Sequence, residues 1–244
     1  MSAPAAQHAL APPAWIGSCE PDLGYKALRW LLVVPLFRLV FHGRRCGVEA
    51  VPARGSLVVV ANHGSHLDPP LLAHAVGRPV AFMAKAELFR VPLLGWIIRA
   101  CGAYPVARGA GDREAIRVAS ERLRQGWATG VFLDGTRQVD GRVNAPQPGA
   151  ALLAARTGSP LLPVAILGSH RALGVGRSTP RPVPIHIRIG RPIPPPASTR
   201  RADLEATTRA CQEAINQLLD LGPIDAAAAR LSPARERGSL PPSS

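Results

Sequence analysis

Residues 58–70, VVVANHGSHLDPP, pass from an apolar run directly into two histidines, a serine and an aspartate. His63 and Asp68 are the pair whose types and spacing could do chemistry. Neutral imidazole is the usual general base at about neutral pH, and a carboxylate partner fixes its tautomer and stabilises the imidazolium that forms. The loop between them is short enough to fold Asp68 back onto His63. The alternative is an ordinary loop histidine beside a helix cap.

No serine or cysteine has the surroundings of a nucleophile, because G-x-S-x-G is absent and Ser65 lies in a different context. The base would therefore act directly on a hydroxyl of the substrate. His63, His66 and Asp68 could instead bind a metal ion, but the sequence offers no second set of ligands, so no metal is expected.

These polar residues follow a predicted strand, and the same pattern recurs along the chain. Short β-branched runs bounded by turn residues predict strands, whereas three- and four-residue periodicity predicts helices. The predicted strands are 56–61, 79–85, 103–108, 130–134, 161–167 and 183–189, the last with the alternation of an edge strand. The predicted helices are 68–76, 89–102, one opening at Asp112, 149–158, and one whose apolar face is Leu204, Thr208, Cys211, Ile215 and Leu218. Asp68 is a good N-cap for the first helix and Pro69 a good first residue.

Alternating strands and helices predict an α/β fold with a mixed, mostly parallel sheet flanked by helices. The domain is expected to run over residues 25–221 as a single unit, with disordered segments at 1–24 and 222–244. Polar clusters lie at three predicted strand ends, 62–68, 105–108 and 134–137. Functional loops of α/β folds lie at the carboxyl ends of strands, so the three clusters are expected to meet.

Four ordered blocks of the chain resemble those of the glycerolipid acyltransferases, the lysophosphatidate (1-acylglycerol-3-phosphate) acyltransferase family. NHGSHLD resembles the block N-H-x-S-x-x-D, and GAYPVAR resembles the second block. FLDGTR resembles the third, which usually reads F-P-E-G-T-R, and LLPVAI resembles the fourth, V-P-V-A-I. AKAELFRVPLLGW, at 84–96, is similar to the segment between the first two blocks, and the likeness covers about residues 30–195.

The resemblance implies a glycerol-3-phosphate acyltransferase-like fold and an enzyme of phospholipid biosynthesis. Such an enzyme moves a fatty acyl chain from acyl-CoA or acyl carrier protein to the free hydroxyl of 1-acyl-sn-glycerol 3-phosphate, with no cofactor beyond the thioester. His63 would be the general base and Asp68 its orienting partner. Backbone amides near Gly64 and Ser65 are candidate donors to the oxyanion. No acyl-enzyme forms in this scheme, so both substrates must be held together.

The same resemblance implies a set of acceptor-binding residues, in which fork-shaped guanidinium groups match phosphate oxygens. This set is Lys85, Arg108, Asp134, Gly135, Thr136 and Arg137. Asn62 and Ser65 would brace the histidine loop by hydrogen bonds, and Pro163 would shape the end of the fourth-block strand near the substrate.

The chain departs from the family pattern at several positions. Asp134 replaces glutamate, Leu133 replaces proline, and Gly64 replaces a longer side chain. APQPG, at 145–149, replaces a stretch that commonly contains Phe-Lys. The departures leave other readings open: another lyso-lipid, a non-phosphate hydroxyl or amine acceptor, or an inactive lipid-binding homologue.

The net charge of +13 results from 29 basic and 16 acidic residues. Of the basic residues, only Lys26 and Lys85 are lysines. A basic surface favours a polyanion, either nucleic acid or anionic lipid headgroups. Basic residues are scattered and no zinc-finger or aromatic–basic motif occurs, so a membrane is favoured over nucleic acid. The four cysteines are widely spaced without C-x-x-C, which predicts free thiols in a reducing compartment.

The apolar stretch 27–41 is interrupted by Arg29 and Arg38, which bracket eight uncharged residues. A spanning helix needs about 20. The stretch predicts either a helix lying in a membrane interface, with arginines reaching the headgroups, or a core helix. We expect a peripheral or monotopic protein at the cytoplasmic face of the cell membrane.

Overall fold

The computed structural model describes residues 23–90, 95, 98, 103–106 and 111–225. A sheet of seven strands runs through them in the order β1-β7-β6-β2-β5-β3-β4. Neighbouring strands are parallel except β6 and β7, which are antiparallel. The strands are β1 (Arg44–Cys46), β2 (Leu57–Ala61), β3 (Val80–Lys85), β4 (Ala103–Val106), β5 (Ala128–Phe132), β6 (Leu161–Leu167) and β7 (His186–Ile189). The predicted mixed, mostly parallel sheet is confirmed.

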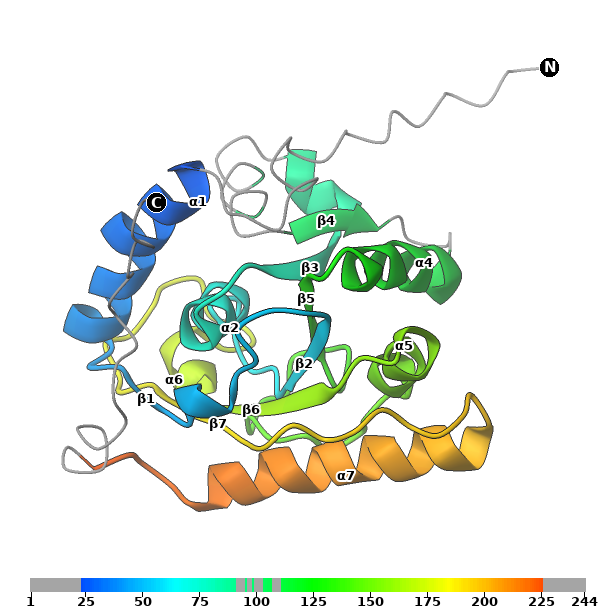
Figure 1. The fold of residues 1–244 in the computed structure, drawn as a ribbon. Coiled ribbons are helices and arrows are strands. Elements are labelled where there is room, and N and C mark those ends of the chain that lie inside the picture. Colours follow the sequence, from blue (N-terminus) through cyan, green and yellow to red (C-terminus); the bar gives the residue numbers. More distant parts are fainter. Residues whose placement is uncertain (1–22, 91–94, 96–97, 99–102, 107–110, 226–244) are drawn as a thin grey trace, which may run out of the picture.

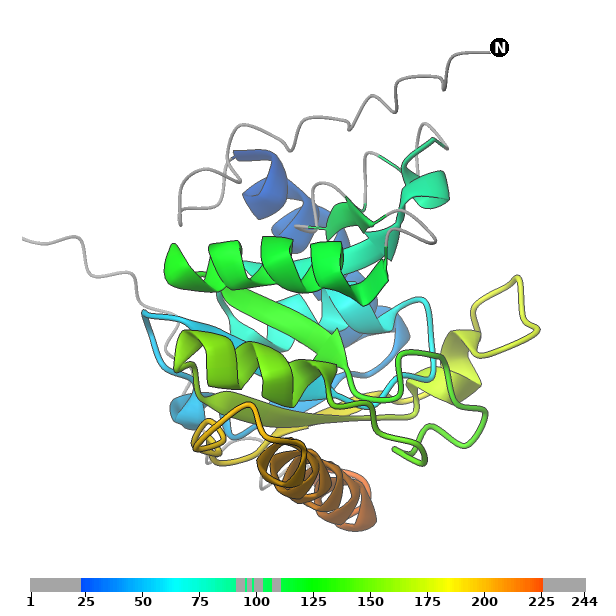
Figure 2. The same cartoon turned by 90° about the vertical axis from the view of Figure 1, so that its right-hand side faces the viewer.

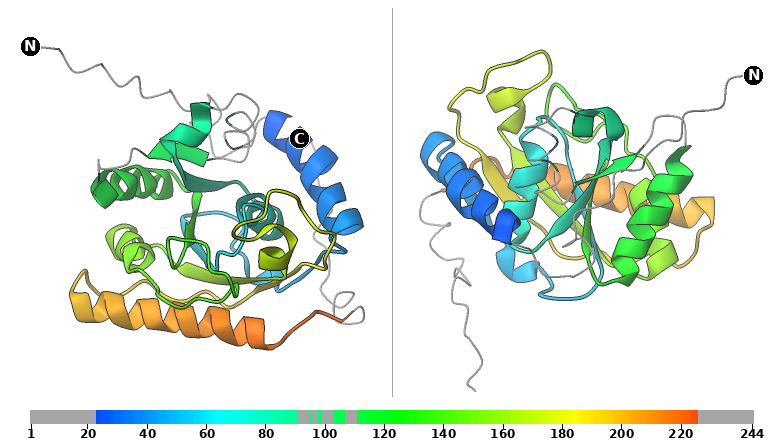
Figure 3. Two further views of the ribbon diagram at one scale, coloured as in Figure 1. Left: turned by 180° about the vertical axis from the view of Figure 1, so that it is seen from behind. Right: turned by 90° about the horizontal axis from the view of Figure 1, so that it is seen from above.

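Helices cover both faces of this sheet (Figures 1 and 2). The α-helices are α1 (Leu23–Leu28), α2 (Asp68–Val76), α4 (Gly111–Arg124), α5 (Gly149–Thr157), α6 (Ser169–Leu173) and α7 (Arg201–Asp220). Short 3₁₀ turns form η4 (Val48–Ala50) and η5 (Ala86–Arg90), and π-helical turns form η2 (Arg29–Val33) and η3 (Leu36–Val40). Figure 3 shows the long α7 from behind, running beside α5.

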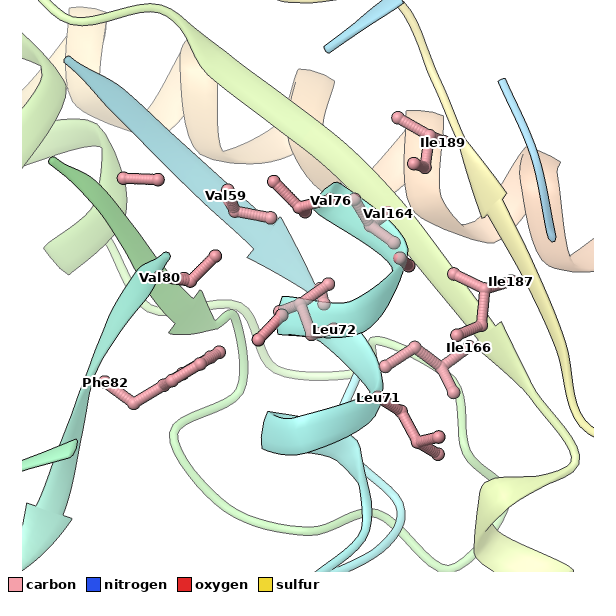
Figure 4. Packing of buried hydrophobic residues seen from close by; sticks show 14 of the residues in the cluster. Val59, Leu71, Leu72, Val76, Val80, Phe82, Val164, Ile166, Ile187 and Ile189 are labelled. Carbon is pink, nitrogen blue, oxygen red and sulfur yellow. The ribbon is translucent and has the colours of Figure 1, made fainter. Parts of the chain in front are cut away.

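The central strand β2 explains the layering, because all five of its residues are buried. Side chains alternate across a strand, so Val59 belongs to one core and Val58 to the other. The first core is closed by α2, whose Leu71, Leu72 and Val76 lie over the sheet in Figure 4. The second core is closed by side chains of α4, α5 and α7. This apolar contact with the sheet thus anchors α2 and the loop that precedes it.

Some element boundaries differ from the sequence predictions. The strand predicted at 130–134 is β5 at Ala128–Phe132, so Asp134 lies in the turn that follows. The strand predicted at 183–189 is shorter and is not at an edge, because β1 pairs with its outer side. Most of the helix predicted at 89–102 lies outside the described residues.

The described chain also extends beyond the predicted end of the domain at residue 221. Ile224 is buried, and its N–H donates to Nδ1 of His186 at 3.2 Å. Arg44 donates from Nη1 to the carbonyl of Ile224 at 2.8 Å. The segments 1–22 and 226–244, predicted to be disordered, lie outside the described residues.

The helical segment before β1 has one buried and one exposed apolar face. Phe37 and Phe41 are buried in the first core. The exposed face carries Trp30, Leu31, Leu32, Leu39 and Val40, of which Leu31 and Leu39 are 79 % and 75 % exposed. In the described part of the chain, no helix is both long and apolar enough to cross a membrane.

Truncating the contact between α2 and the sheet should weaken the fold. Leu72→Ala removes a fully buried side chain, so we expect a loss of about 2–5 kcal/mol in the free energy of unfolding, measured by urea denaturation. Leu221→Ala, at a leucine that is 64 % exposed, should change it by less than about 0.5 kcal/mol. Equal losses in the two variants would contradict the anchoring role of α2.

Candidate active site

The polar residues of the first block lie at the carboxyl end of β2, near the middle of the sheet. The strands on either side, β5 and β6, run parallel to β2. The loops that follow these strands therefore leave the sheet at the same edge, and hydrogen bonds join them. Gln138 N–H donates to the carbonyl of His63 at 2.7 Å, and Leu133 N–H donates to that of Ala61 at 3.0 Å. The polar clusters at 62–68 and 134–137 meet, as predicted; residues 107–110 lie outside the described chain.

His63 and Asp68 are in direct contact. Nδ1 of His63 lies 2.9 Å from Oδ2 of Asp68, which is fully buried, while the imidazole remains 17 % exposed. The same oxygen accepts the N–H groups of Gly64 and Ser65, both at 2.8 Å. A carboxylate on Nδ1 selects the tautomer that carries its proton there, which leaves Nε2 as an acceptor.

These contacts overturn two expectations. Asp68 does not cap α2: the helix begins without a side-chain cap, because Asp68 turns back onto the preceding loop. Pro69, near the start of the helix, has no N–H. The uncapped first turn therefore contains one fewer backbone N–H that needs a hydrogen-bond acceptor. The amides of Gly64 and Ser65 are not free to bind an oxyanion either, because both already donate to Asp68.

An aromatic stack holds the plane of the His63 imidazole. The ring of His63 lies 4.1 Å from that of Phe132, with 17° between the planes. Phe82 continues the stack, 6.1 Å from Phe132. Gly130 makes room for it, because a Cβ at that position would lie 2.2 Å from the Phe82 ring. Sequence reasoning missed Phe132, although a strand ending in phenylalanine beside a polar turn was the available signal.

Asn62 and Ser65 tie the histidine loop to its surroundings. Nδ2 of Asn62 donates to the carbonyls of Gly141 and Ile166 at 2.7 and 2.9 Å, and its Oδ1 accepts the N–H of Ile166 at 2.8 Å. Oγ of Ser65 donates to the carbonyl of Leu173 at 2.8 Å. Both side chains are buried, so these bonds are shielded from water.

Asp134 braces a loop. Its Oδ1 accepts the N–H groups of Asn144 and Ala145 at 3.1 and 2.7 Å, while its buried Oδ2 has no hydrogen-bond partner among the described residues. Burial raises the pKa of this carboxyl, and the two amides and the charge of His63 act in the opposite direction. The carboxylate that replaces the expected glutamate thus lies close to His63 but is committed to the backbone.

The turn after Asp134 presents the remaining third-block residues. Gly135 adopts φ +67°, a conformation that favours glycine. Thr136 is exposed, and its Oγ1 lies 3.4 Å from Nε2 of Gln138. Arg137 is half-buried, and its charge lowers the pKa of His66, after the larger effect of burial.

The remaining three predicted site residues are either outside the described part of the structure or away from the predicted position. Lys85 ends β3, but its side chain lies outside what the structure describes, as does the whole of Arg108. Pro163 is buried in the body of β6 and pairs with Val60, so it does not shape the strand end as expected. Its carbonyl accepts the N–H of Gly190 at 2.8 Å. Among the described residues, no three metal-ligating side chains lie together.

Helix α6 packs directly on the histidine loop, a contact that sequence reasoning missed. A Cβ at Gly64 would lie 2.7 Å from Cβ and 3.2 Å from Cα of His170. A Cβ at Gly141, which has φ +70°, would lie 2.5 Å from Nδ1 of His170. The space that a side chain at Gly64 would need is therefore filled by the backbone and Cβ of His170, while the imidazole of His170 lies against Gly141.

Comparison with known proteins gives a consistent set of relatives. The sequence profile of the Acyltransferase family matches residues 44–167. The 1-acyl-sn-glycerol-3-phosphate acyltransferase BAT2 of Brassica napus chloroplasts is 30 % identical over 133 residues, which cover 53 % of this chain and 38 % of that protein. The 1-acyl-sn-glycerol-3-phosphate acyltransferase of Streptococcus pneumoniae is 31 % identical over 154 residues, covering 62 % of this chain and 57 % of that protein. The chain thus spans well under two thirds of both curated relatives.

The likeness to a solved structure extends further along the chain. The crystal structure of the 1-acyl-sn-glycerophosphate acyltransferase PlsC from Thermotoga maritima superposes with a TM-score of 0.69 and 30 % identity. The superposition covers 82 % of this chain and 81 % of that one.

Filling the space at Gly64 should disturb the site. In Gly64→Ala the new methyl group meets the backbone of α6 as well as a side chain, so we expect about 1–3 kcal/mol of destabilisation and at least a roughly tenfold loss of activity. Gly149→Ala is the matched control, because a Cβ there meets no atom within 4 Å. Thermal unfolding and thiol release measure the two effects. An unchanged Gly64→Ala enzyme would show that α6 does not hold the loop.

Proposed function

Since the chain belongs to the acyltransferase family, we propose that it transfers a fatty acyl group from acyl-CoA or acyl carrier protein to the free hydroxyl of 1-acyl-sn-glycerol 3-phosphate. The observation that carries this proposal is the 2.9 Å contact between His63 and Asp68 at the carboxyl end of β2. A base of this kind suits the deprotonation of an alcohol as it attacks an acyl carbonyl.

In the proposed reaction, Nε2 of His63 takes the proton of the acceptor hydroxyl as its oxygen bonds to the thioester carbonyl carbon. The tetrahedral intermediate then expels the thiolate, which takes the proton back from the imidazolium. Asp68 stabilises that imidazolium. The scheme needs no metal or organic cofactor beyond the thioester itself.

Direct transfer, rather than an acyl-enzyme, is supported by the state of Ser65. Its hydroxyl donates to the carbonyl of Leu173 and accepts the N–H of Leu67 at 3.1 Å. An oxygen engaged in this way is a poor nucleophile, so the two substrates must meet in one complex.

We assign the acceptor phosphate to Arg137. No carboxylate forms an ion pair with this guanidinium within the described ranges, and it lies beside the histidine loop. Lys85 and Arg108 stay predictions for the same role. Because Asp134 stands where the family pattern has glutamate, we test the acceptor with a panel of lyso-lipids and one fixed thioester.

Removing the base should abolish transfer without unfolding the protein. For His63→Gln and for Asp68→Asn we expect thiol release from acyl-CoA plus lysophosphatidate to fall by at least about 100-fold. His42→Gln and Asp225→Asn change exposed residues outside the loops of the site and should retain wild-type rates. Full activity in a folded His63→Gln variant would refute the assignment.

We further infer that the exposed face of the N-terminal helical segment binds a membrane. The exposed apolar side chains of this segment adjoin the exposed Lys26 and Arg38 in the sequence, a pattern typical of a helix that rests in an anionic lipid interface. Arg29 lies over the ring of Trp30, 5.4 Å from its centre. The side of the membrane stays a prediction.

Charging this face should release the protein from lipid. Each leucine that enters the interface contributes about 1.5–3 kcal/mol, so Leu31→Glu with Leu39→Glu should weaken vesicle binding by at least roughly 100-fold. Sedimentation with phosphatidylglycerol-containing vesicles measures the effect. Leu221→Glu, an exposed leucine at the end of α7, is the control. Equal binding by the double variant and the control would disprove this docking face.

A further inference from the structure

The second histidine of the NHGSHLD block has no role in the scheme above, yet it borders the reacting groups. His66 is exposed in the turn between His63 and α2. Burial of part of the ring lowers its pKa, and the charges of Arg137 and His63 lower it further, while Asp68 acts in the opposite direction. His66 on the loop after β2 and Arg137 on the loop after β5 are therefore close enough for the guanidinium charge to act on the imidazole.

Contacts between the two loops keep this arrangement in place. The N–H of Gln138, next to Arg137, donates to the carbonyl of His63. The turn that carries His66 is closed by the N–H of Asp68, which donates to the carbonyl of Ser65 at 3.3 Å. The loops that carry His66 and Arg137 are thus joined by a backbone hydrogen bond at His63.

Positive charge gathers here without an equal negative charge. Among the charged groups of the described residues that act on His66, only Asp68 is acidic, and its Oδ2 already accepts hydrogen bonds from His63 and two amides. An anion between His66 and Arg137 would remove the repulsion and favour the imidazolium, because an opposite charge stabilises the protonated ring. The charge pattern thus fits a ligand with a strongly anionic group.

We propose that His66 is a further acceptor-binding residue, which takes up a proton when the acceptor's phosphate binds and then shares that phosphate with Arg137. The inference rests on the proposed function and names the phosphate monoester as the group recognised. The bound proton turns a neutral ring into a charge-assisted hydrogen-bond donor. Binding should therefore be tighter at a pH where proton uptake is easy.

Titration of the histidines directly tests whether His66 takes up a proton when a phosphate monoester binds. In ¹⁵N-histidine NMR, adding sn-glycerol 3-phosphate to the full chain should raise the pKa of His66, whereas glycerol, which lacks the charge, should leave it unchanged. His66→Gln identifies the resonance, and His42→Gln is the control. A His66 resonance whose titration is the same with and without glycerol 3-phosphate would overturn the inference.

Steady-state kinetics give an independent measure. Relative to wild type, His66→Gln should raise the KM for lysophosphatidate about tenfold at about pH 6 and hardly at all at about pH 8.5, with kcat nearly unchanged. The ratio of the two enzymes cancels the titration of the substrate phosphate. A ratio that does not vary with pH would overturn the inference while leaving the proposed function intact. Wild-type protein that releases no thiol with lysophosphatidate would instead refute the proposed function, and the NMR titration would still decide the role of His66.

Discussion

The site depends on one oxygen atom. Oδ2 of Asp68 accepts three hydrogen bonds, from the ring of His63 and from the amides of Gly64 and Ser65. A buried N–H that lost this acceptor would cost about 1–3 kcal/mol, so the carboxylate shapes the loop as well as orienting the imidazole. Its position is set in turn by α2, which Leu72 and its neighbours hold against the sheet. The packing of the core therefore sets the position of the His63 imidazole through a single side chain.

The parallel arrangement of β2, β5 and β6 supplies the rest of the site. The three strands end at the same side of the sheet, and buried hydrogen bonds from Asn62 join the loop after β2 to the loop after β5 and to the end of β6. Phe132 at the end of β5 stacks on the imidazole of His63, and α6 after β6 packs against Gly64. On these loops His66 stays exposed and Arg137 half-buried, and the charge of Arg137 acts on the imidazole of His66.

The amino-acid sequence predicts the parts of this structure that rest on local chemistry. Buried β-branched runs such as Leu57–Ala61 become strands, and the six-residue block from His63 to Asp68 predicts a dyad. The sequence does not show whether the Asp68 carboxylate caps α2 or accepts hydrogen bonds from the preceding loop, because an aspartate at this position suits both roles. Only the packed position of α2 selects the second outcome, which also withdraws the Gly64 and Ser65 amides from any oxyanion role.

Other features depend on contacts between distant residues. The strand β1 is short and polar, and it exists because it pairs with β7. The fit of Gly64 against His170 has no local signal, since a glycine after a histidine suggests only a flexible turn. The sequence around Pro163 likewise predicts the end of a strand, whereas the pairing with Val60 places this residue inside β6.

The most direct test of the central claim is the tautomer of His63, which long-range ¹⁵N–¹H NMR correlations report at about neutral pH. The carboxylate at Nδ1 requires the proton to reside on that nitrogen, so Nε2 should be unprotonated and free to accept. Replacement of Asp68 by asparagine should relax this preference. A wild-type His63 that carries its proton on Nε2 would contradict the account, because the ring could then not take a proton from an acceptor alcohol.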